Sequence, residues 1–196
     1  MKLVVPQRLL GPRMFLACAL MVELLIIMAI DMYVPALPSM QREFGVTAAY
    51  LNLTMFAFFA VGAVGVVLAG PMSDRLGRKP VVVAGCVLFT ASSLGCALAP
   101  NVEALVFFRM IEALGYGAVT TLATALVKDA FTGADLKTAM TCLQSFILIG
   151  PAVAPFLGTF VLSHTDWRGI FVVLTFFGVG ALACALLMTE TLPRTA

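Results

Sequence analysis

The sequence contains very few charged residues. Asp, Glu, Lys and Arg make up 11% of the chain, apolar residues make up 62%, and the mean hydropathy is +1.07. Soluble domains contain about 25% charged and roughly 45–50% apolar residues. A water-soluble fold of 196 residues could not bury this much apolar surface, so the composition excludes that class.

Paired cysteines, metal-ligand clusters and catalytic arrangements are also missing. The five cysteines have no paired spacing and fall within apolar stretches, where they are expected to pack as small apolar residues. The single histidine, His164, stands beside Asp166 and Trp167, a setting typical of a membrane interface. The sequence contains no Ser/His/Asp arrangement and no phosphate-binding loop. It therefore predicts no enzyme, no cofactor, no metal site and no nucleic-acid partner.

Six long apolar runs account for most of the chain. A helix needs about 20 apolar residues to cross the hydrocarbon core of a bilayer. Each run is continuous and does not alternate with polar residues, as a barrel strand would, so we expect helices. The prediction is an all-α membrane protein, a six-helix bundle forming one domain over residues 1–196. The runs cover residues 14–34, 49–70, 80–99, 104–127, 139–163 and 169–189.

Basic residues outside the runs are distributed unequally between the two sides of the predicted membrane. Only Arg42 and Arg168 fall on one side. The other side holds Lys2, Arg8, Arg13, Arg75, Arg78, Lys79, Lys128, Lys137 and Arg194. Because cytoplasmic loops carry the excess of Lys and Arg, both termini are predicted to be cytoplasmic.

Four charged side chains lie within the runs and are functional candidates, since lipid should exclude them: Glu23, Asp31, Arg109 and Glu112. Asp31 and Arg109 are predicted at similar depths, so they could pair across helices. That pair could equally be structural, and Glu112, three residues after Arg109, could simply neutralise it within one helix.

Glu23 lies near the middle of the first run, where the sequence places no cation at its own depth. Desolvation in an apolar cavity disfavours the charged form of a carboxyl group, so such a group exchanges protons readily. It also attracts lipophilic cations. Proton and cation would then compete for one negative charge, which is the requirement for antiport.

The connection between the second and third runs is rich in turn-forming residues. Gly70 and Pro71 are expected to end one helix, Gly77 permits a tight turn, and Pro80 suits the first turn of the next helix. Asp74 could lie against a helix N-terminus and favour one conformation through the helix dipole. The simpler alternative is a basic turn that only fixes topology.

The fifth run contains two prolines, Pro151 and Pro155, which remove backbone donors and favour a bent helix. Gly150, Ala154 and Gly158 recur every four residues, a spacing that lets a neighbouring helix approach closely. We expect a bending or gating helix, although packing alone would explain the glycines.

These motifs resemble those of the major facilitator superfamily, in particular its bacterial drug/proton antiporters of the Bcr/CflA and MdfA type. The segment Gly70–Lys79 matches the signature G-x-x-x-D-R-x-G-R-[RK] at every fixed position. Asp31–Pro38 resembles the end of the first span, and Gly150–Gly158 resembles the antiporter motif of the fifth. The positions that carry the first signature are Gly70, Asp74, Arg75, Gly77, Arg78 and Lys79.

The resemblance implies alternating access around a central cavity between two six-helix halves, in a bacterial inner membrane. It implies that Asp74 latches against the partner half, that Glu23 and Asp31 carry protonation and cation recognition, and that Arg109 tunes them. Glu112 replaces the glutamine usual in the family. The expected partners are lipophilic or cationic small molecules, protons and membrane lipid.

The family normally has twelve spans, and this chain has the length of its N-terminal half. Two copies inserted in the same orientation could form a complete cavity as a homodimer, or a complementary C-terminal half could complete it. The leading hypothesis is a half-size proton-coupled antiporter that exports drugs. The alternatives are a half without transport activity alone and a uniporter or importer on the same scaffold.

Overall fold

A computed structural model of the chain describes residues 3–4, 7 and 10–192. Within these residues, six helical spans are long and apolar enough to cross a membrane, which confirms the six-helix prediction. The predicted runs and the observed helices agree closely in the middle and differ at the ends. The elements are α1 (Pro12–Asp31), η1 (Val34–Ala36), α2 (Leu37–Phe44), α3 (Ala48–Leu76), α4 (Arg78–Ala97), α5 (Val102–Ala130), α6 (Gly133–His164) and α7 (Trp167–Leu187).

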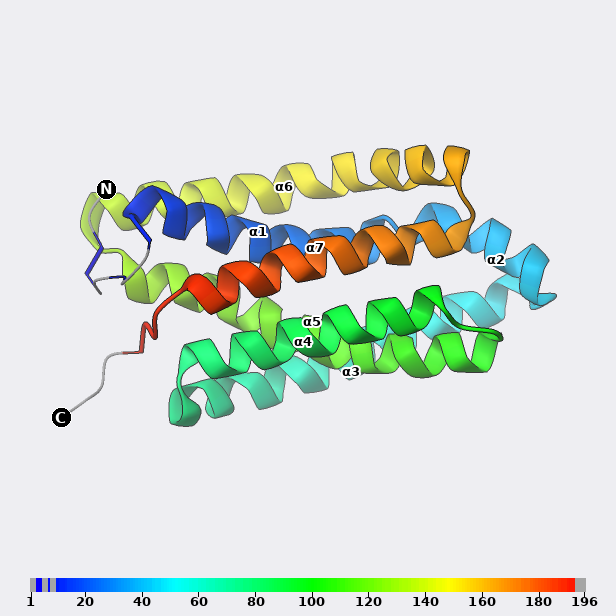
Figure 1. Cartoon of the computed structure of the whole chain (residues 1–196), viewed down its shortest axis with the longest axis horizontal. Coiled ribbons are helices and arrows are strands. Elements are labelled where there is room, and N and C mark those ends of the chain that lie inside the picture. Colours follow the sequence, from blue (N-terminus) through cyan, green and yellow to red (C-terminus); the bar gives the residue numbers. More distant parts are fainter. Residues whose placement is uncertain (1–2, 5–6, 8–9, 193–196) are drawn as a thin grey trace.

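The long helices alternate in direction along the bundle, so α1 begins and α7 ends at the same end (left in Figure 1). We name this the terminal end and the other the distal end. Figure 1 shows the long helices in two groups, α1 with α6 and α7, and α3 with α4 and α5. Contacts of α4 with α7 and of α1 with α5 join the two groups.

The contacts between helices follow a pseudo-two-fold pattern. Helix α5 packs on α3 and α4, and α1 packs on α6 and α7 in the same way. Exchanging α1 with α5, α3 with α6 and α4 with α7 therefore reproduces the set of main contacts. The exchange leaves α3 and α6 at opposite edges of the bundle, where only 28% and 17% of their apolar windows are buried.

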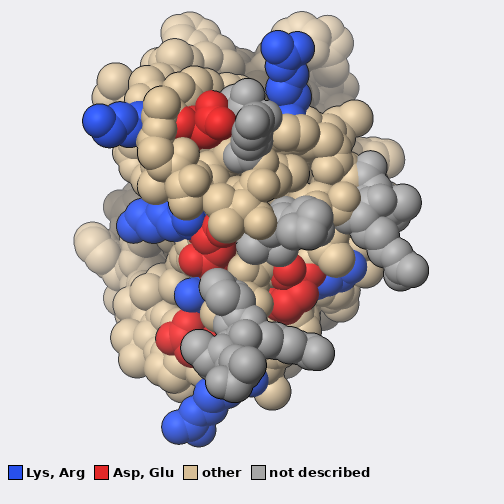
Figure 2. Space-filling model, turned by 90° about the vertical axis from the view of Figure 1, so that its left-hand side faces the viewer, with Lys and Arg blue, Asp and Glu red and all other residues tan. Residues whose placement is uncertain are grey.

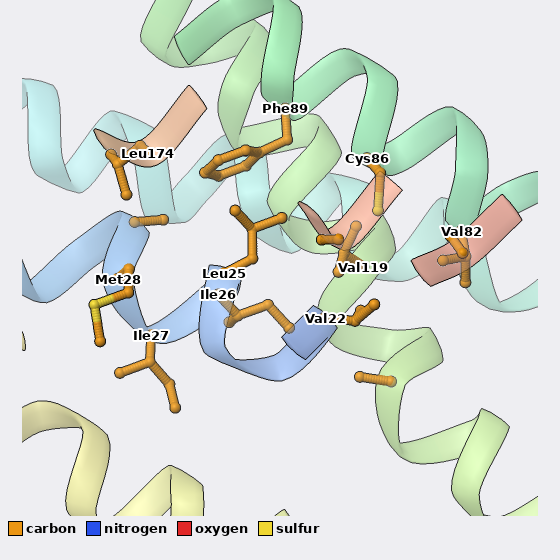
Figure 3. Packing of buried hydrophobic residues seen from close by; sticks show 14 of the residues in the cluster. Val22, Leu25, Ile26, Ile27, Met28, Val82, Cys86, Phe89, Val119 and Leu174 are labelled. Carbon is orange, nitrogen blue, oxygen red and sulfur yellow. The ribbon is translucent and has the colours of Figure 1, made fainter. Parts of the chain in front are cut away.

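Helix α1 is the centre of the apolar core. Val22, Leu25 and Ile26 point toward α4, α5 and α7, while Ile27 points toward α6 (Figure 3). Because successive helical residues are rotated by about 100°, these adjacent residues can contact helices on different sides of α1.

Glycines let α5 approach its neighbours closely. A Cβ atom at Gly117 would collide with the carbonyl oxygen of Gly62 on α3. One at Gly115 would lie 2.7 Å from the carbonyl oxygen of Gly85 on α4. These positions require residues without side chains because membrane helices associate mainly by close packing.

The prediction that Gly70 and Pro71 end a helix is wrong, because α3 continues through both to Leu76. Proline at this position removes only one intrahelical hydrogen bond, and the polar turn that follows remains helical. The helix ends instead at Gly77, whose φ of +103° is accessible to glycine. As predicted, Gly77 makes the turn, and Pro80 lies in the first turn of α4.

Charged side chains are spread over the terminal end (Figure 2). The exposed bases there include Arg13, Arg75, Lys128 and Lys137, while Arg42 and Arg168 belong to the elements at the distal end. The predicted bias in basic residues therefore separates the two ends of the bundle. Lys2, Arg8 and Arg194 lie outside the described residues.

Candidate functional site

Glu23 and Asp31 lie on one side of α1, at intervals of four residues with Ile27 between them. The side chain of Ile27 contacts α6, since a Cβ at Gly150 would come within 2.5 Å of Ile27 Cγ2. Gly150 therefore lets α6 lie against α1 between the two carboxyl groups. We name Glu23, Ile27 and Asp31 the α1 strip.

The two carboxyl groups of the α1 strip lack counter-ions within the described part of the chain. Glu23 is 5% exposed, and its Oε2 atom has no hydrogen-bond partner there. Asp31, the last residue of α1, is half-buried, and no ion pair or side-chain hydrogen bond involves it in the same set of residues. A buried carboxyl group without a partner is costly, which is why such a group is a functional candidate.

Arg109 pairs with Glu112 in the same helix. The two side chains form an ion pair of 2.7 Å, and Ser93 of α4 donates a hydrogen bond of 2.6 Å to the other oxygen of Glu112. Arg109 is 2% exposed and Glu112 is fully buried. The pair therefore neutralises itself inside the bundle.

Three aromatic rings enclose the guanidinium of Arg109. Its central carbon lies 4.3 Å from the ring centroid of Tyr33, 4.2 Å from that of Phe58 and 5.7 Å from that of Phe171. Rings at these distances attract a cation through their quadrupoles. The cluster joins α3, α5, α7 and Tyr33, which lies two residues beyond the end of α1.

Arg109 also contacts the C-terminal turn of α1, where it donates to the carbonyl oxygen of Ala29 at 3.3 and 3.4 Å. In a continued helix the amide of Tyr33 would donate to the carbonyl oxygen of Ala29. Here it donates to the carbonyl oxygen of Ile30, 3.2 Å away, which leaves the Ala29 carbonyl to Arg109. A cation at a helix C-terminus is also favoured by the helix dipole.

The predicted pair between Asp31 and Arg109 does not form, and the alternative partner, Glu112, takes its place. Asp31 follows Ala29 by two residues and is therefore rotated by about 200° around α1. When Arg109 faces Ala29, Asp31 points away from it. Similar depth was predicted from the sequence, but direction around the helix was not.

The signature segment at the terminal end contains a helix cap that the sequence reasoning missed. The carboxylate of Glu190 accepts hydrogen bonds from the first two amides of α4, Arg78 N at 2.8 Å and Lys79 N at 3.1 Å. A Cβ atom at Gly77 would collide with this carboxylate. The side chain of Lys79 in turn donates to the carbonyl oxygen of Leu186, 2.8 Å away, near the end of α7.

Arg78 connects α3, α4 and α5. It forms ion pairs with Asp74 at 2.8 Å and Asp129 at 3.1 Å, and it donates to Ser73 at 2.6 Å. The side chain of Asp74 is 63% exposed in the last turn of α3, and the N-terminus of α4 is occupied by Glu190. Arg75, next in the signature, is exposed. Asp129 carried no sequence signal that linked it to the segment.

Helix α6 contacts α1 through its glycines and exposes much of its remaining surface. A Cβ at Gly158 would lie 2.8 Å from the carbonyl oxygen of Met32, so Gly158, like Gly150, is a contact position. Pro151 and Pro155 lie inside the helix, and their missing amides remove the usual donors to the carbonyls four residues earlier.

Comparison with known proteins identifies the family. Residues 19–196 match the family model described as "Major Facilitator Superfamily". The chain belongs to the major facilitator superfamily. This superfamily consists of transporters, and the six-helix bundle is half of its fold.

The chain spans about half the length of the relatives and solved structures that it matches. A chloramphenicol resistance protein from Pseudomonas aeruginosa is 34% identical over 174 residues, which are 88% of this chain and 41% of that protein. The multidrug resistance protein MdtL from Klebsiella pneumoniae is 31% identical over 180 residues, 91% of this chain and 46% of that protein. A solved D-xylose-proton symporter superposes with a TM-score of 0.81 at 19% identity, covering 93% of this chain and 49% of that one.

Membership of this superfamily and the six spans make the chain part of a multi-pass membrane protein. The resemblance seen in the sequence is thereby confirmed for the family and the fold.

Proposed function

We propose that the chain forms the N-terminal half of a proton-coupled antiporter that exports lipophilic or cationic drugs. The observation that carries this proposal is the α1 strip, with the unpartnered Oε2 atom of Glu23 and the uncompensated carboxyl group of Asp31. The names of the relatives, which refer to chloramphenicol and multidrug resistance, support drugs as the substrate class. Those bacterial relatives also support the inner membrane as the location.

The charges of the site favour cations. The negative charge of Glu112 offsets the positive charge of Arg109, and both are buried together. Glu23 and Asp31 then remain as the acids to which a proton or a cationic substrate can bind. Arg109 contributes by holding the end of α1, from which Asp31 projects.

Transport requires alternating access, for which a second six-helix unit has to face the α1 strip. Either a second copy of this chain or a complementary C-terminal half could supply it. In that assembly, Asp74 would latch against the second unit, supported by Arg78, while α6 would act as the gating helix through Gly150, Pro151, Pro155 and Gly158. The exposed position of Asp74 is compatible with such a contact.

Proton release on substrate binding tests the proposal. When a lipophilic phosphonium cation is added to the purified chain in weakly buffered nanodiscs, we expect protons to be released into the medium. Glu23→Gln should abolish this release, because a neutral amide has no proton to exchange. Glu103→Gln is the matched control, since Glu103 is exposed at the start of α5 and should release as the unmodified chain does.

The alternative is a half that folds but does not transport alone. It is favoured by the coverage of the relatives, since the chain spans 41% and 46% of the two proteins compared above. The same experiment separates the two cases. Release that persists in Glu23→Gln would contradict the role of Glu23, whereas an unmodified chain that releases no protons would favour the inactive half.

A further inference from the structure

An open groove lies between α3 and α4, in the half of the bundle nearest the terminal end. The two helices each pack on α5 more than on each other, which leaves a space of about 200 Å³ between them. Every residue that lines this α3–α4 groove is Gly, Ala, Val, Leu or Met. The exposed ones are Leu68, Met72, Ala84 and Leu88. The groove is therefore apolar throughout and open on its outer side.

A second hollow, of about 450 Å³, lies beside the turn from α3 to α4. The two hollows follow each other along both helices. On α3, Leu68, Met72 and Leu76 stand at intervals of four residues on one face, and Leu76 lines the second hollow. On α4, Pro80 lines the second hollow and precedes Ala84 by four residues. An acyl chain in the groove would therefore have its polar end at the second hollow.

Two bases, Arg75 and Lys79, line this second hollow. Within the described part of the chain, no ion pair or hydrogen bond involves the side chain of Arg75. The ammonium group of Lys79 donates to the carbonyl oxygen of Leu186 at 2.8 Å and keeps two further hydrogens for a ligand. Both bases can therefore donate to an anion such as a phosphate group.

The acids near the second hollow already have partners. Glu190 lines the hollow, but its carboxylate caps α4 by accepting hydrogen bonds from the first two amides of that helix. Asp74 and Asp129 both form ion pairs with Arg78. Arg75 is thus the base at this turn that is left for a ligand.

The α3–α4 groove is as deep as one leaflet of a bilayer. From Gly65 to Leu76, α3 rises by about 16 Å at 1.5 Å per residue. The hydrocarbon core of a bilayer is about 30 Å thick, so one leaflet contributes about 15 Å. Arg75 is then level with the lipid headgroups. The terminal end is predicted to be cytoplasmic, and cytoplasmic leaflets carry anionic lipids that attract bases.

We infer that the α3–α4 groove binds an anionic phospholipid, with an acyl chain along the groove and the phosphate group on Arg75 and Lys79. Such a lipid does not compete with the proposed latch. Asp74 stands two residues from both Met72 and Leu76, so it is turned by about 200° to the other side of α3. The inference goes beyond the proposed function and does not depend on proton coupling.

Native mass spectrometry of the purified chain, titrated with dioleoylphosphatidylglycerol, tests the role of the base. Arg75→Gln should weaken binding of this lipid about fivefold, which corresponds to about 1 kcal/mol for one base near an anionic headgroup. Arg13→Gln is the matched control, because Arg13 is an exposed arginine at the same end, in the first turn of α1. It should bind the lipid as the unmodified chain does.

A second pair of variants tests the groove. Ala84→Phe should also weaken binding, because the new ring fills the space of the acyl chain. Ala63→Phe is the matched control, since Ala63 is exposed and stands two residues before Gly65, on the other side of α3. Equal binding in Ala84→Phe and Ala63→Phe, or in Arg75→Gln and Arg13→Gln, would overturn the inference.

Two further probes separate a lipid from a free phosphate. Dioleoylglycerol has the chains without the phosphate, so it should bind more weakly and be insensitive to Arg75→Gln. Glycerol phosphate has the phosphate without the chains and should not bind in the same concentration range. Binding of glycerol phosphate as tight as that of the lipid would overturn the inference. So would a chain that retains no phosphatidylglycerol, which would leave the groove to a protein partner.

Discussion

At the scale of single residues, the main feature is that the buried charges are divided between two places. Arg109 and Glu112 satisfy each other inside a cage of aromatic rings, while Glu23 and Asp31 are left on the other side of α1 without cations in the described chain. Charges that are paired and enclosed can stabilise the fold, whereas unpaired carboxyl groups can change their protonation state. This division leads to a test of stability.

Glu112→Gln should destabilise the bundle by about 3 kcal/mol, because it leaves the buried Arg109 without its counter-ion. Thermal unfolding in a mild detergent measures the loss. The double variant Arg109→Met/Glu112→Gln should lose less than the single one, since no buried charge then remains unpaired. If the single variant unfolds at the temperature of the unmodified chain, Glu112 is not the counter-ion that stabilises Arg109.

Sequence reasoning identified all four charges within the spans but left the partner of Arg109 open between Asp31 and Glu112. Lipid excludes charge, so any Asp, Glu or Arg inside an apolar run is recognisable from the sequence alone. Depth follows from residue number, which placed Asp31 and Arg109 at one height. The direction around α1 depends on the packing of several helices, and it is this direction that turns Asp31 away from Ala29 and Arg109.

At the scale of helices, the close approach of α5 to its neighbours depends on particular glycines. Gly117→Ala should destabilise the bundle by about 1–3 kcal/mol, because its new Cβ would collide with the carbonyl oxygen of Gly62. Gly70→Ala is the matched control, since nothing lies within 4 Å of a Cβ there. We expect it to be neutral or to gain up to about 1 kcal/mol from helix propensity.

Thermal unfolding of both variants in one detergent checks this difference. Equal losses would show that the α3–α5 contact tolerates a side chain and that its glycines are not required. The Gly70→Ala variant also tests the signature segment, to which Gly70 belongs. If the variant is stable but loses function, the added Cβ must disturb a contact with another unit, because nothing within this bundle lies near it.

Helix existence was predictable and helix ends were not. Long apolar runs fix the number and type of the spans, because only helices and closed barrels satisfy the backbone within lipid, and a barrel strand would alternate apolar with polar residues. Hydropathy cannot detect the polar turn from Pro71 to Leu76, which remains helical, or the short helix α2 beyond the first span. The cap on α4 comes from Glu190, 112 residues from Arg78 along the chain, so no local pattern could predict it.

At the scale of the whole molecule, the bundle leaves its two edge helices, α3 and α6, largely exposed. Helix α6 exposes Leu148 and Phe156, which lipid could cover, but also Thr141, Gln144 and Ser145. The hydroxyls of Thr141 and Ser145 bond backbone carbonyls of α6 itself, but lipid offers no partner for the amide of Gln144, so this polar strip within a span favours contact with protein or water. A second six-helix unit would provide that contact.

Native mass in nanodiscs tests which unit this is. If two copies form the transporter, the purified chain should have twice its monomer mass of 20.8 kDa. Thr141→Cys should then crosslink between copies, while Phe176→Cys, whose residue is 73% exposed on α7, should not, because α7 is not an edge helix. A monomeric mass without crosslinks would contradict the homodimer and favour a complementary C-terminal half, since the polar strip of α6 would still lack its cover.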